Sequence, residues 1–347
     1  MTVVAITWDD AAGSSGLGAI RLLDQTLLPT VTQDRVVETT ADLVAAIADL
    51  AVRGAPALGV TGALAVVLAM DEGRREGWNA VEVDAAIDRV RTARPTAVNL
   101  AWGVDQVRPL VPQGRAVVLA AARAVAADDE AANRALSRAG ADWLLAQIDR
   151  PALRVLTHCN TGSLATSAWG TGLGIMRELH ARGRLELVIA DETRPLLQGA
   201  RLTAYELAQD GIPHLLQVDG AAASTVMRGL VDCAIVGADR IAANGDTANK
   251  IGTLGVALAC HAAGIPFVVG APWSTVDLSL ADGTGIEIEE RSGDEVTCYA
   301  SVRVAPLQTV GFNPAFDVTP ARYVSAVVTE RGVVEPAKGG TLSASQK

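Results

Sequence analysis

The chain has 347 residues, 50% of them hydrophobic but only 3% aromatic, and its formal net charge at pH 7 is −10. This length is typical of about two domains, and apolar residues that are mostly Ala, Val, Leu and Ile are typical of helices packed on a buried parallel sheet. The acidic balance excludes a broad basic surface for nucleic acid or for anionic lipids.

Four cysteines and four histidines are scattered along the chain, without the spacing of a zinc site or of a disulfide framework. The N-terminal residues lack the basic start and apolar segment of a secretory signal. No apolar run without charges and turn residues reaches the roughly 20 residues that cross a bilayer. We therefore expect a reduced, cytoplasmic protein with no metal, no nucleic-acid partner and no membrane contact.

Residues 1–148 are predicted to form a mainly helical domain with short strands. The strands are expected at Val3–Thr7 and Ala19–Leu23. Apolar residues recur at helical spacing in five later segments. These predicted helices are Thr40–Val52, Gly59–Met70, Val81–Ala93, Gly114–Ala127 and Glu130–Ile148. The turn-like stretch Asp149–Pro151 is the expected domain boundary, although 131–147 can also be interpreted as a connecting helix.

Residues 149–336 show short apolar runs that alternate with turns and helical segments, which indicates βαβ units around a parallel sheet. The predicted strands are Arg154–Thr157, Leu187–Ala190, His214–Val218, Cys233–Val236 and Phe267–Gly270. Ligands of such sheets bind beyond the carboxyl ends of the strands. The loops expected there are His158–Gly162, Asp191–Arg194, Asp219–Gly220, Gly237–Arg240 and Ala271–Ser274. Residues 337–347 form a polar tail that we expect to be disordered.

Cys159 follows the first of these strands, and the next residues, Thr161–Ser163, are predicted to open a helix. A thiol at the positive end of a helix dipole has a lowered pKa, which favours a catalytic role. The alternative is a buried, unreactive cysteine.

Asp239 follows the strand Cys233–Val236. A carboxyl group between apolar walls at the end of a strand can act as a general acid or base. The alternatives are a helix cap or an ion pair with Arg240.

Lys250 is the only lysine in the body of the chain, because the other two, Lys338 and Lys347, lie in the tail. It follows Asn249 at the end of a polar loop that leads into the predicted helix Leu254–His261. A cation near a helix start is typical of an anion site. The alternative is a solvated loop.

Arg53 and Gly54 precede Pro56, which suits the first turn of a helix. A guanidinium beside exposed backbone N–H groups can hold a phosphate, and Arg94 before Pro95 repeats the pattern. The alternative is an ordinary turn between helices. The glycine-rich stretch 170–174 is not G-x-G-x-x-G, and no P-loop motif occurs. Binding of NAD or ATP is therefore disfavoured.

Nine ordered segments of the chain resemble the methylthioribose-1-phosphate isomerase family, a group that also holds the alpha, beta and delta regulatory subunits of the eukaryotic translation initiation guanine-nucleotide exchange factor. The resemblance runs from about Ile6 to Pro336. The segments are Leu23–Pro29, Ala51–Ala57, Arg94–Leu100, Cys159–Gly162, Asp191–Pro195, Gln198–Thr203, Gly237–Ile241, Asn249–Thr253 and Asn313–Pro320.

The resemblance implies an α/β protein with a helical N-terminal domain, a Rossmann-like C-terminal domain and a site between them. It implies that Asp239 is the proton donor and Cys159 the transition-state stabiliser, without a cofactor. The substrate contacts that it implies are Arg53, Gly54, Ala55, Arg94, Gln198, Asn249 and Lys250. The expected reaction turns 5-methylthioribose 1-phosphate into 5-methylthioribulose 1-phosphate in methionine salvage, and the expected state is a homodimer. Residues 9–18 are longer and richer in Gly and Ser than the family pattern, which leaves the role of Trp8 open.

The chemistry of this reaction agrees with the residues. A sugar phosphorylated at C1 is locked as a ring, so isomerisation needs an acid for the ring oxygen, a polar group beside the reacting carbons and a phosphate clamp. Asp239 and Cys159 fit the first two roles, and Arg53 with Lys250 fits the third. An enolate path and a hydride shift both remain open.

Two alternatives share the scaffold. A non-catalytic regulatory subunit would not need Cys159, Asp239 and Lys250 together. A sister isomerase of 5-deoxyribose 1-phosphate or ribose 1,5-bisphosphate would differ in the pocket for the far end of the sugar.

Overall fold

The computed structural model describes residues 3–14, 16–95, 97–300 and 302–343, in two compact units. The N-terminal unit comprises the chain up to Ala135 together with Thr161–Gly174, and the C-terminal unit comprises Leu136–Asn160 and the chain from Ile175 onward. The division therefore falls inside a helix, whereas the sequence predicted it at residues 149–151.

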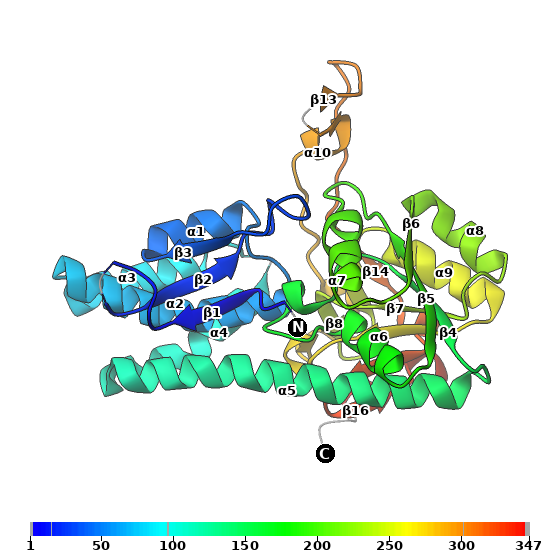
Figure 1. The fold of residues 1–347 in the computed structure, drawn as a ribbon, viewed down its shortest axis with the longest axis horizontal. Coiled ribbons are helices and arrows are strands. Elements are labelled where there is room, and N and C mark those ends of the chain that lie inside the picture. Colours follow the sequence, from blue (N-terminus) through cyan, green and yellow to red (C-terminus); the bar gives the residue numbers. More distant parts are fainter. Residues whose placement is uncertain (1–2, 15, 96, 301, 344–347) are drawn as a thin grey trace. The chain divides into compact units, whose positions relative to one another are not determined.

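The N-terminal unit combines a three-stranded antiparallel sheet with four helices (Figure 1). The strands β1 (Ile6–Asp9), β2 (Ala19–Leu23) and β3 (Asp34–Val37) pair in that order. The helices are α1 (Thr40–Ala48), α2 (Ala55–Glu76), α3 (Ala80–Arg91) and α4 (Val98–Val107), followed by the 3-10 helix η1 (Arg108–Gln113). The mainly helical character predicted for this part of the chain is confirmed.

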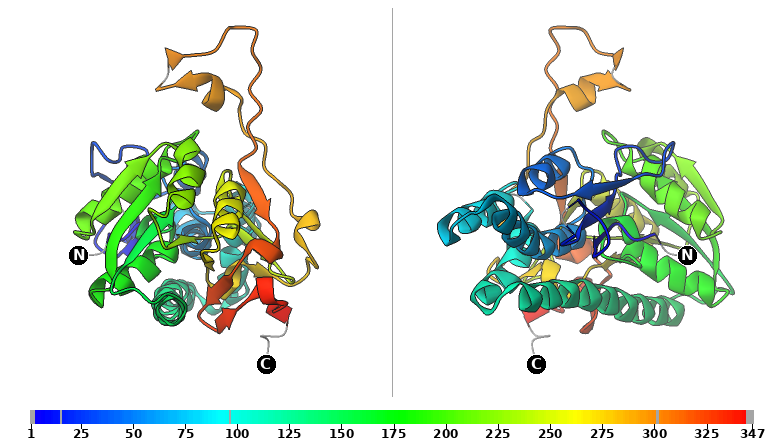
Figure 2. Two further views of the ribbon diagram at one scale, coloured as in Figure 1. Left: turned by 90° about the vertical axis from the view of Figure 1, so that its right-hand side faces the viewer. Right: turned by 60° about the vertical axis from the view of Figure 1, so that its left-hand side comes forward.

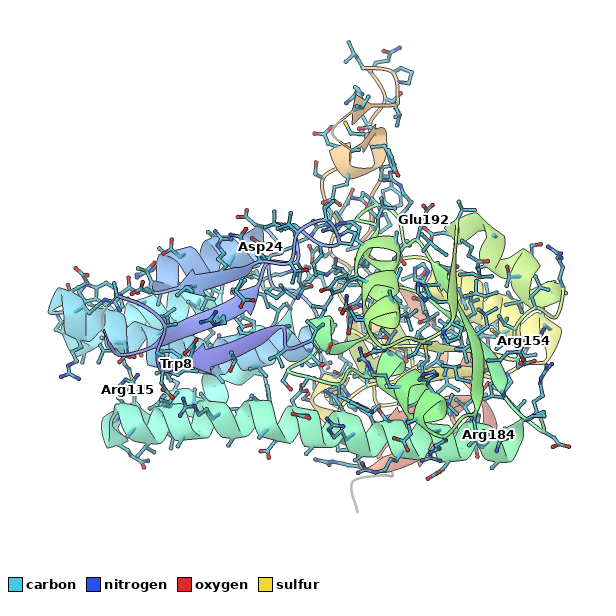
Figure 3. All side chains as sticks on the ribbon, viewed as in Figure 1. Trp8, Asp24, Arg115, Arg154, Arg184 and Glu192 are labelled. Carbon is cyan, nitrogen blue, oxygen red and sulfur yellow. The ribbon has the colours of Figure 1, made fainter. Side chains whose placement is uncertain are left out.

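Helix α2 is the central element of the N-terminal core. Its length and apolar composition would allow it to cross a membrane, but 83% of its most apolar stretch is buried inside the folded chain, as in a core helix. The indole of Trp8 is also buried in this unit, with the Arg115 guanidinium 5.5 Å from its ring centroid (Figure 3). Arg115 is held in turn by Asp71 at 2.6 Å. In this structure Trp8 is therefore a packing residue.

Helices α5 (Arg115–Gln147) and α6 (Gly172–Ala181) each run from the N-terminal unit into the C-terminal unit. The sequence predicted two helices, Gly114–Ala127 and Glu130–Ile148, where the structure has the single helix α5. The carboxylate of Asp129 instead accepts hydrogen bonds from the backbone N–H and the hydroxyl of Ser167, at 2.8 and 2.6 Å. A tertiary contact therefore stabilises the helix where the local pattern is weakest.

The C-terminal unit is built on a seven-stranded sheet of order β16-β15-β10-β7-β4-β5-β6, in which only β16 is antiparallel to its neighbour. The strands are β4 (Leu153–Thr157), β5 (Leu185–Asp191), β6 (His214–Gln217), β7 (Cys233–Val236), β10 (Phe267–Gly270), β15 (Ala326–Thr329) and β16 (Gly332–Val334). Helices α7 (Ala204–Gln209), α8 (Ala222–Met227) and α9 (Thr253–Ala263) connect them. Strands β7, β10 and β15 are buried along their whole length, which explains their continuous apolar runs. The predicted parallel α/β sheet is confirmed.

A second sheet of order β11-β8-β9-β14 adjoins these elements in the C-terminal unit. Its strands are β8 (Arg240–Ala242), β9 (Thr247–Lys250), β11 (Val276–Asp277) and β14 (Phe316–Thr319). The sequence predicted a polar loop over residues 242–253, and this prediction is wrong. The segment forms a hairpin because β9 pairs with β14, which lies more than 60 residues further along the chain.

Residues 287–314 of the C-terminal unit extend away from its sheet as an arm (Figures 1 and 2). The arm carries α10 (Asp294–Thr297) and the short strands β12 (Cys298–Tyr299) and β13 (Val302–Arg303). The guanidinium of Arg194, in the loop after β5, donates to the carbonyl of Glu295 on α10 at 3.1 Å and so contacts the arm.

Residues 337–343 of the polar tail are ordered, whereas the sequence predicted disorder from residue 337 onward. Pro336–Lys338 form a 3-10 turn, and Leu342 is fully buried against the C-terminal core. Residues 344–347 lie outside the described residues, and Lys347 is one of them.

Candidate active site

The ends of strands β4 and β7 define the site. Strands β5 and β6 extend the sheet on one side of β4, and β7 and β10 extend it on the other side. The direction of winding therefore reverses between β4 and β7, which is where open parallel sheets bind ligands. Cys159 follows β4, and Asp239 follows β7. The structure thus brings the loops of both predicted catalytic residues to one edge of the sheet.

Cys159 is held in an unusual backbone conformation. Its φ is 68°, in the left-handed region that non-glycine residues rarely occupy. Its N–H donates to the Thr193 hydroxyl oxygen at 2.9 Å, and its carbonyl accepts from the Thr203 hydroxyl at 2.7 Å. The predicted helix at Thr161–Ser163 is absent: only the three-residue 3-10 turn η2 (Ser163–Ala165) follows, and α6 begins at Gly172. The prediction that a helix dipole acts on the thiol is therefore wrong.

Gln198 is the polar neighbour of the thiol. Its Nε2 donates to Cys159 Sγ at 3.3 Å, and its side chain is fully buried. Its Oε1 is buried without a hydrogen-bond partner in the described part of the chain. Because buried acceptors are nearly always paired, Oε1 is suited to receive a hydroxyl of a bound molecule. Gly199 permits this placement, since a Cβ there would collide with the Asp191 carbonyl oxygen and come within 2.7 Å of Thr193 Oγ1.

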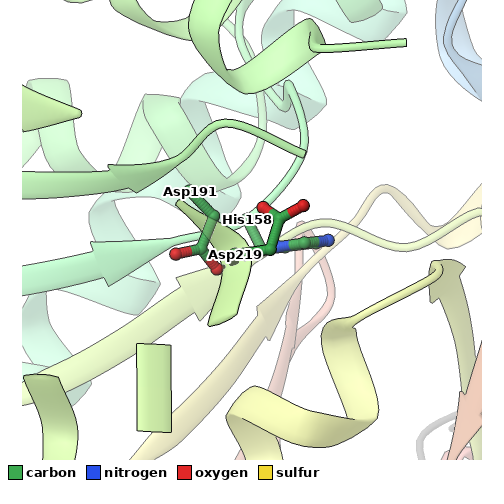
Figure 4. Close-up of side chains that lie close together, drawn as sticks. All are labelled: His158, Asp191 and Asp219. Atoms are coloured by element: carbon green, nitrogen blue, oxygen red, sulfur yellow. Dashed lines mark hydrogen bonds and ion pairs between the residues drawn. The ribbon is translucent and has the colours of Figure 1, made fainter. Parts of the chain in front are cut away.

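His158, Asp191 and Asp219 form a compact cluster (Figure 4). The ring nitrogens of His158 lie 2.9 Å from Asp191 Oδ2 and 2.8 Å from the Ile251 carbonyl oxygen. Burial disfavours the imidazolium, but these two acceptors favour it, and the pKa of His158 is raised.

Each oxygen of these two carboxylates accepts a hydrogen bond. Asp191 Oδ1 accepts from the Gln217 amide at 2.8 Å, and the Asp219 oxygens accept from the backbone N–H groups of Thr193 and Arg194, both at 2.7 Å. The spacing of the cluster would suit a metal ion. Its ligand atoms are already used to hold loops together, so we interpret the cluster as a hydrogen-bond network.

Asn249 and Lys250 lie on β9, both nearly fully buried. The Asn249 amide donates to Thr253 Oγ1 at 2.9 Å, and Lys250 Nζ lies 4.4 Å from the centroid of the Phe316 ring. We expected the start of helix α9 to add an anion site, and this expectation is wrong. The backbone N–H groups of Gly252 and Leu254 already donate to the two oxygens of Asp317, at 2.8 and 3.1 Å. The ammonium group of Lys250 itself remains a candidate in this unit for binding an anion.

The other predicted substrate contacts, Arg53, Gly54, Ala55 and Arg94, belong to the N-terminal unit. Gly54 is the N-cap of α2 with φ 95°, and a Cβ there would lie 2.6 Å from the Cα of Ala165. The first turn of helix α2 contains Pro56 and no acidic residue, and its N-cap makes no side-chain hydrogen bond among the described residues. Such an uncapped start is suited to bind an anion. Arg94 lies in the connection between α3 and α4, and Thr96 beside it lies outside the described residues.

In the glycine-rich stretch 170–174, Gly170 serves close packing of the backbone. Gly170 has φ 89°, and a Cβ there would lie 2.5 Å from the Cα of Gly162.

No functional role was predicted from the sequence for Thr193, Thr203 or His158. The strand-end rule had selected the loops of Thr193 and His158 for inspection, and that was the available signal. No such signal exists in the sequence for Thr203, because only the folded chain brings its hydroxyl to the Cys159 carbonyl.

Comparisons with protein families and with known proteins identify relatives of this chain. Residues 51–336 match the initiation factor 2 subunit family. The methylthioribose-1-phosphate isomerase of Anaeromyxobacter sp. (strain K) is 50% identical over 95% of this chain and 93% of its own length. A Nocardia farcinica protein, named probable bifunctional methylthioribose-1-phosphate isomerase/methylthioribulose-1-phosphate dehydratase, is 52% identical over 98% of this chain. The chain spans only 60% of that bifunctional relative.

Two solved structures share the fold. The 5-methylthioribose 1-phosphate isomerase from Pyrococcus horikoshii OT3 has a TM-score of 0.85 and 38% identity, covering 96% of this chain and 94% of its own. The translation initiation factor eIF-2B subunit delta from A. fulgidus has a TM-score of 0.83 and 37% identity, covering 96% of both chains.

Proposed function

This chain belongs to the initiation factor 2 subunit family, and we propose that within it the chain is an aldose–ketose isomerase that converts 5-methylthioribose 1-phosphate to 5-methylthioribulose 1-phosphate in methionine salvage. The observation that carries the proposal is the pairing of β4 with β7, which sets the loops of Cys159 and Asp239 side by side at the switch point of the sheet. Relatives at 45–52% identity that bear the isomerase name support it.

In the proposed mechanism Asp239 donates a proton to the ring oxygen, which opens the ring. Cys159, with its sulfur fixed by Gln198, then assists the movement of hydrogen from C2 to C1, and the C2 hydroxyl returns its proton to the Asp239 carboxylate as the C2 carbonyl forms. The orphan Oε1 of Gln198 accepts a hydrogen bond from a sugar hydroxyl. Electrostatic groups fixed before the reaction act most strongly in a site from which water is excluded, and the burial of Gln198 and Cys159 meets this condition.

We assign binding of the phosphate and sugar to Arg53, Gly54, Ala55, Arg94, Asn249 and Lys250. The uncapped start of α2 supports the role of the first three, because it combines backbone N–H groups with a neighbouring guanidinium. The place of Lys250 beside Asn249 on β9 supports its role, because a buried ammonium attracts an anion more strongly than an exposed one. No residue of this set is a metal ligand in the proposed mechanism.

We also propose a cytoplasmic homodimer whose C-terminal unit functions as a Rossmann-like domain. The winding of the sheet outward from β4 in both directions supports the domain assignment. The arm supports the dimer, because large apolar side chains on it are exposed, with Leu307 at 86%, Val310 at 92% and Phe312 at 76%. Apolar side chains that cluster on a surface in this way are typical of a protein interface.

The experiment is turnover of a panel of ribose 1-phosphates that differ only in the 5-substituent, followed by ³¹P NMR of the ketose product. We expect the 5-methylthio compound to have the highest kcat/KM, ahead of the 5-deoxy sugar and the 5-phosphate. Cys159→Ser and Asp239→Asn should each abolish most turnover and leave the melting temperature within a few degrees. Absence of turnover with every member of the panel would remove the isomerase function and favour the non-catalytic regulatory subunit.

A further inference from the structure

We propose that Thr193 is a positioning residue, which together with Thr203 fixes the peptide groups on both sides of Cys159 and thereby aims the thiol at Gln198. The inference rests on the proposed function, because it concerns the same thiol. It assigns to two hydroxyl groups a role that neither charge nor sequence spacing indicates.

The backbone conformation of Cys159 is energetically costly. A non-glycine residue in the left-handed region costs about 1–3 kcal/mol, so other contacts must hold it there. In Cys159 both peptide groups are held by side chains. The N–H donates to Thr193 Oγ1 at 2.9 Å, and the carbonyl accepts from Thr203 Oγ1 at 2.7 Å.

The hydroxyl of Thr193 is fixed in orientation by two hydrogen bonds. It donates its proton to the Asp191 carbonyl at 3.0 Å, which leaves a lone pair for the Cys159 N–H. The backbone of Thr193 is fixed as well, because its N–H donates to Asp219 Oδ1 at 2.7 Å. Thr193 and Thr203 are both fully buried, so bulk water cannot replace either hydroxyl.

The loop that contains Thr193 and Gln198 has no room to relax. Thr193 and Leu197 are also left-handed, with φ of 64° and 57°. A Cβ on Gly199 would come within 2.7 Å of Thr193 Oγ1. The strained loop therefore carries both the hydroxyl that holds the Cys159 peptide and the Gln198 amide that contacts its sulfur. Strain of this kind persists where the surrounding contacts determine the geometry, and it is concentrated at functional sites.

The test uses Thr193→Val, which keeps the β-branched shape and its backbone preference but removes the hydroxyl, and Thr193→Ser, which keeps the hydroxyl. Thr61→Val is the matched control, since Thr61 is also fully buried and its hydroxyl donates to a backbone carbonyl, that of Ala57, at 2.7 Å. Two measurements are made: the kinetics of isomerisation, and the rate at which iodoacetamide alkylates Cys159, read by peptide mass spectrometry in a Cys298→Ser background.

We expect Thr193→Val to lower kcat roughly 100-fold with KM changed less than about threefold, the size of effect that a misplaced catalytic group produces. Alkylation of Cys159 should slow at least fivefold, because a sulfur that the Gln198 amide no longer holds is less well oriented for attack. Thr193→Ser should recover both measurements to within about threefold, and Thr61→Val should change neither.

Unchanged kcat in folded Thr193→Val would overturn the inference, and so would a Ser variant as impaired as the Val variant. A loss of kcat without a change in alkylation would also overturn it. If Thr193→Val does not fold, the Thr203→Val and Thr203→Ser pair provides the same comparison. If the unaltered chain shows no turnover, the proposed function fails, and the alkylation rates of the Val and Ser variants still decide the positioning role.

Discussion

Replacement of Gln198 by methionine should lower activity without lowering stability. Methionine has a similar length and fills the buried space, but it removes the Nε2 donor to Cys159 Sγ and the unpaired Oε1. A hydrogen bond to a charged group is worth about 1.5–3 kcal/mol. If the bond to sulfur strengthens in the transition state, kcat should fall by roughly 10- to 150-fold.

The stability of this variant should move little or rise. An unpaired buried acceptor costs about 1–3 kcal/mol, and its removal compensates for the lost bond to sulfur. The matched control is Gln217→Met. Both polar atoms of Gln217 are paired, with Asp191 Oδ1 at 2.8 Å and with the Thr225 hydroxyl at 2.7 Å. Its loss leaves both partners unpaired and should lower the free energy of unfolding by about 1–3 kcal/mol, or the melting temperature by about 2–4 °C per kcal/mol.

The assays are steady-state kinetics of ketose 1-phosphate formation and differential scanning calorimetry. The two variants should separate: Gln198→Met loses kcat and keeps its melting temperature, and Gln217→Met loses melting temperature. A Gln198→Met protein that melts several degrees lower would refute the claim that Oε1 is an unpaired acceptor. One that retains full kcat would remove the amide from the mechanism.

Three further predictions concern charge, assembly and pH. Lys250→Arg should raise KM about tenfold with a smaller change in kcat, because a guanidinium does not fit the buried place of the ammonium against Phe316; an unchanged KM would exclude Lys250 from the clamp. Leu307→Asp with Val310→Asp should convert a dimer to a monomer in sedimentation velocity, and a dimer that persists would remove the arm from the interface. His158→Asn should destabilise the protein most below pH 6.5. Because the pKa of His158 is raised in the folded protein, its stabilisation is complete below the unfolded pKa of about 6.5 and is lost as the pH rises through the folded pKa. A difference in melting temperature between variant and unaltered protein that grows with pH would contradict this.

The sequence was sufficient to predict elements whose signal is local. The runs Cys233–Val236 and Phe267–Gly270 are strands with the predicted bounds, because each is a continuous apolar segment buried on both faces. The strand-end rule then selected Cys159 and Asp239 without any knowledge of the strand order. That rule needs only the ends of strands, and apolar runs mark those ends well.

Features that depend on distant residues could not be predicted in this way. The sequence of strand β9 is typical of a polar loop, and only its pairing with β14 makes it a strand. The start of α9 resembles an anion site in the sequence, but Asp317 on β14 accepts hydrogen bonds from its N–H groups. The left-handed conformation of Cys159 has no local signal either, since glycine or asparagine would be expected at such a position. In each case a residue tens of positions away decides the outcome, and local propensity is overridden.

The fold alone does not decide between an enzyme and a regulatory subunit, because solved structures with either name have TM-scores above 0.8 to this chain. The distinction must come from the site. A regulatory scaffold gains nothing from a left-handed cysteine whose peptide groups, sulfur and neighbouring loop are all held by buried hydrogen bonds, and each strained residue costs about 1–3 kcal/mol. A catalyst gains a thiol with one fixed direction. The strain around Cys159 therefore favours the isomerase.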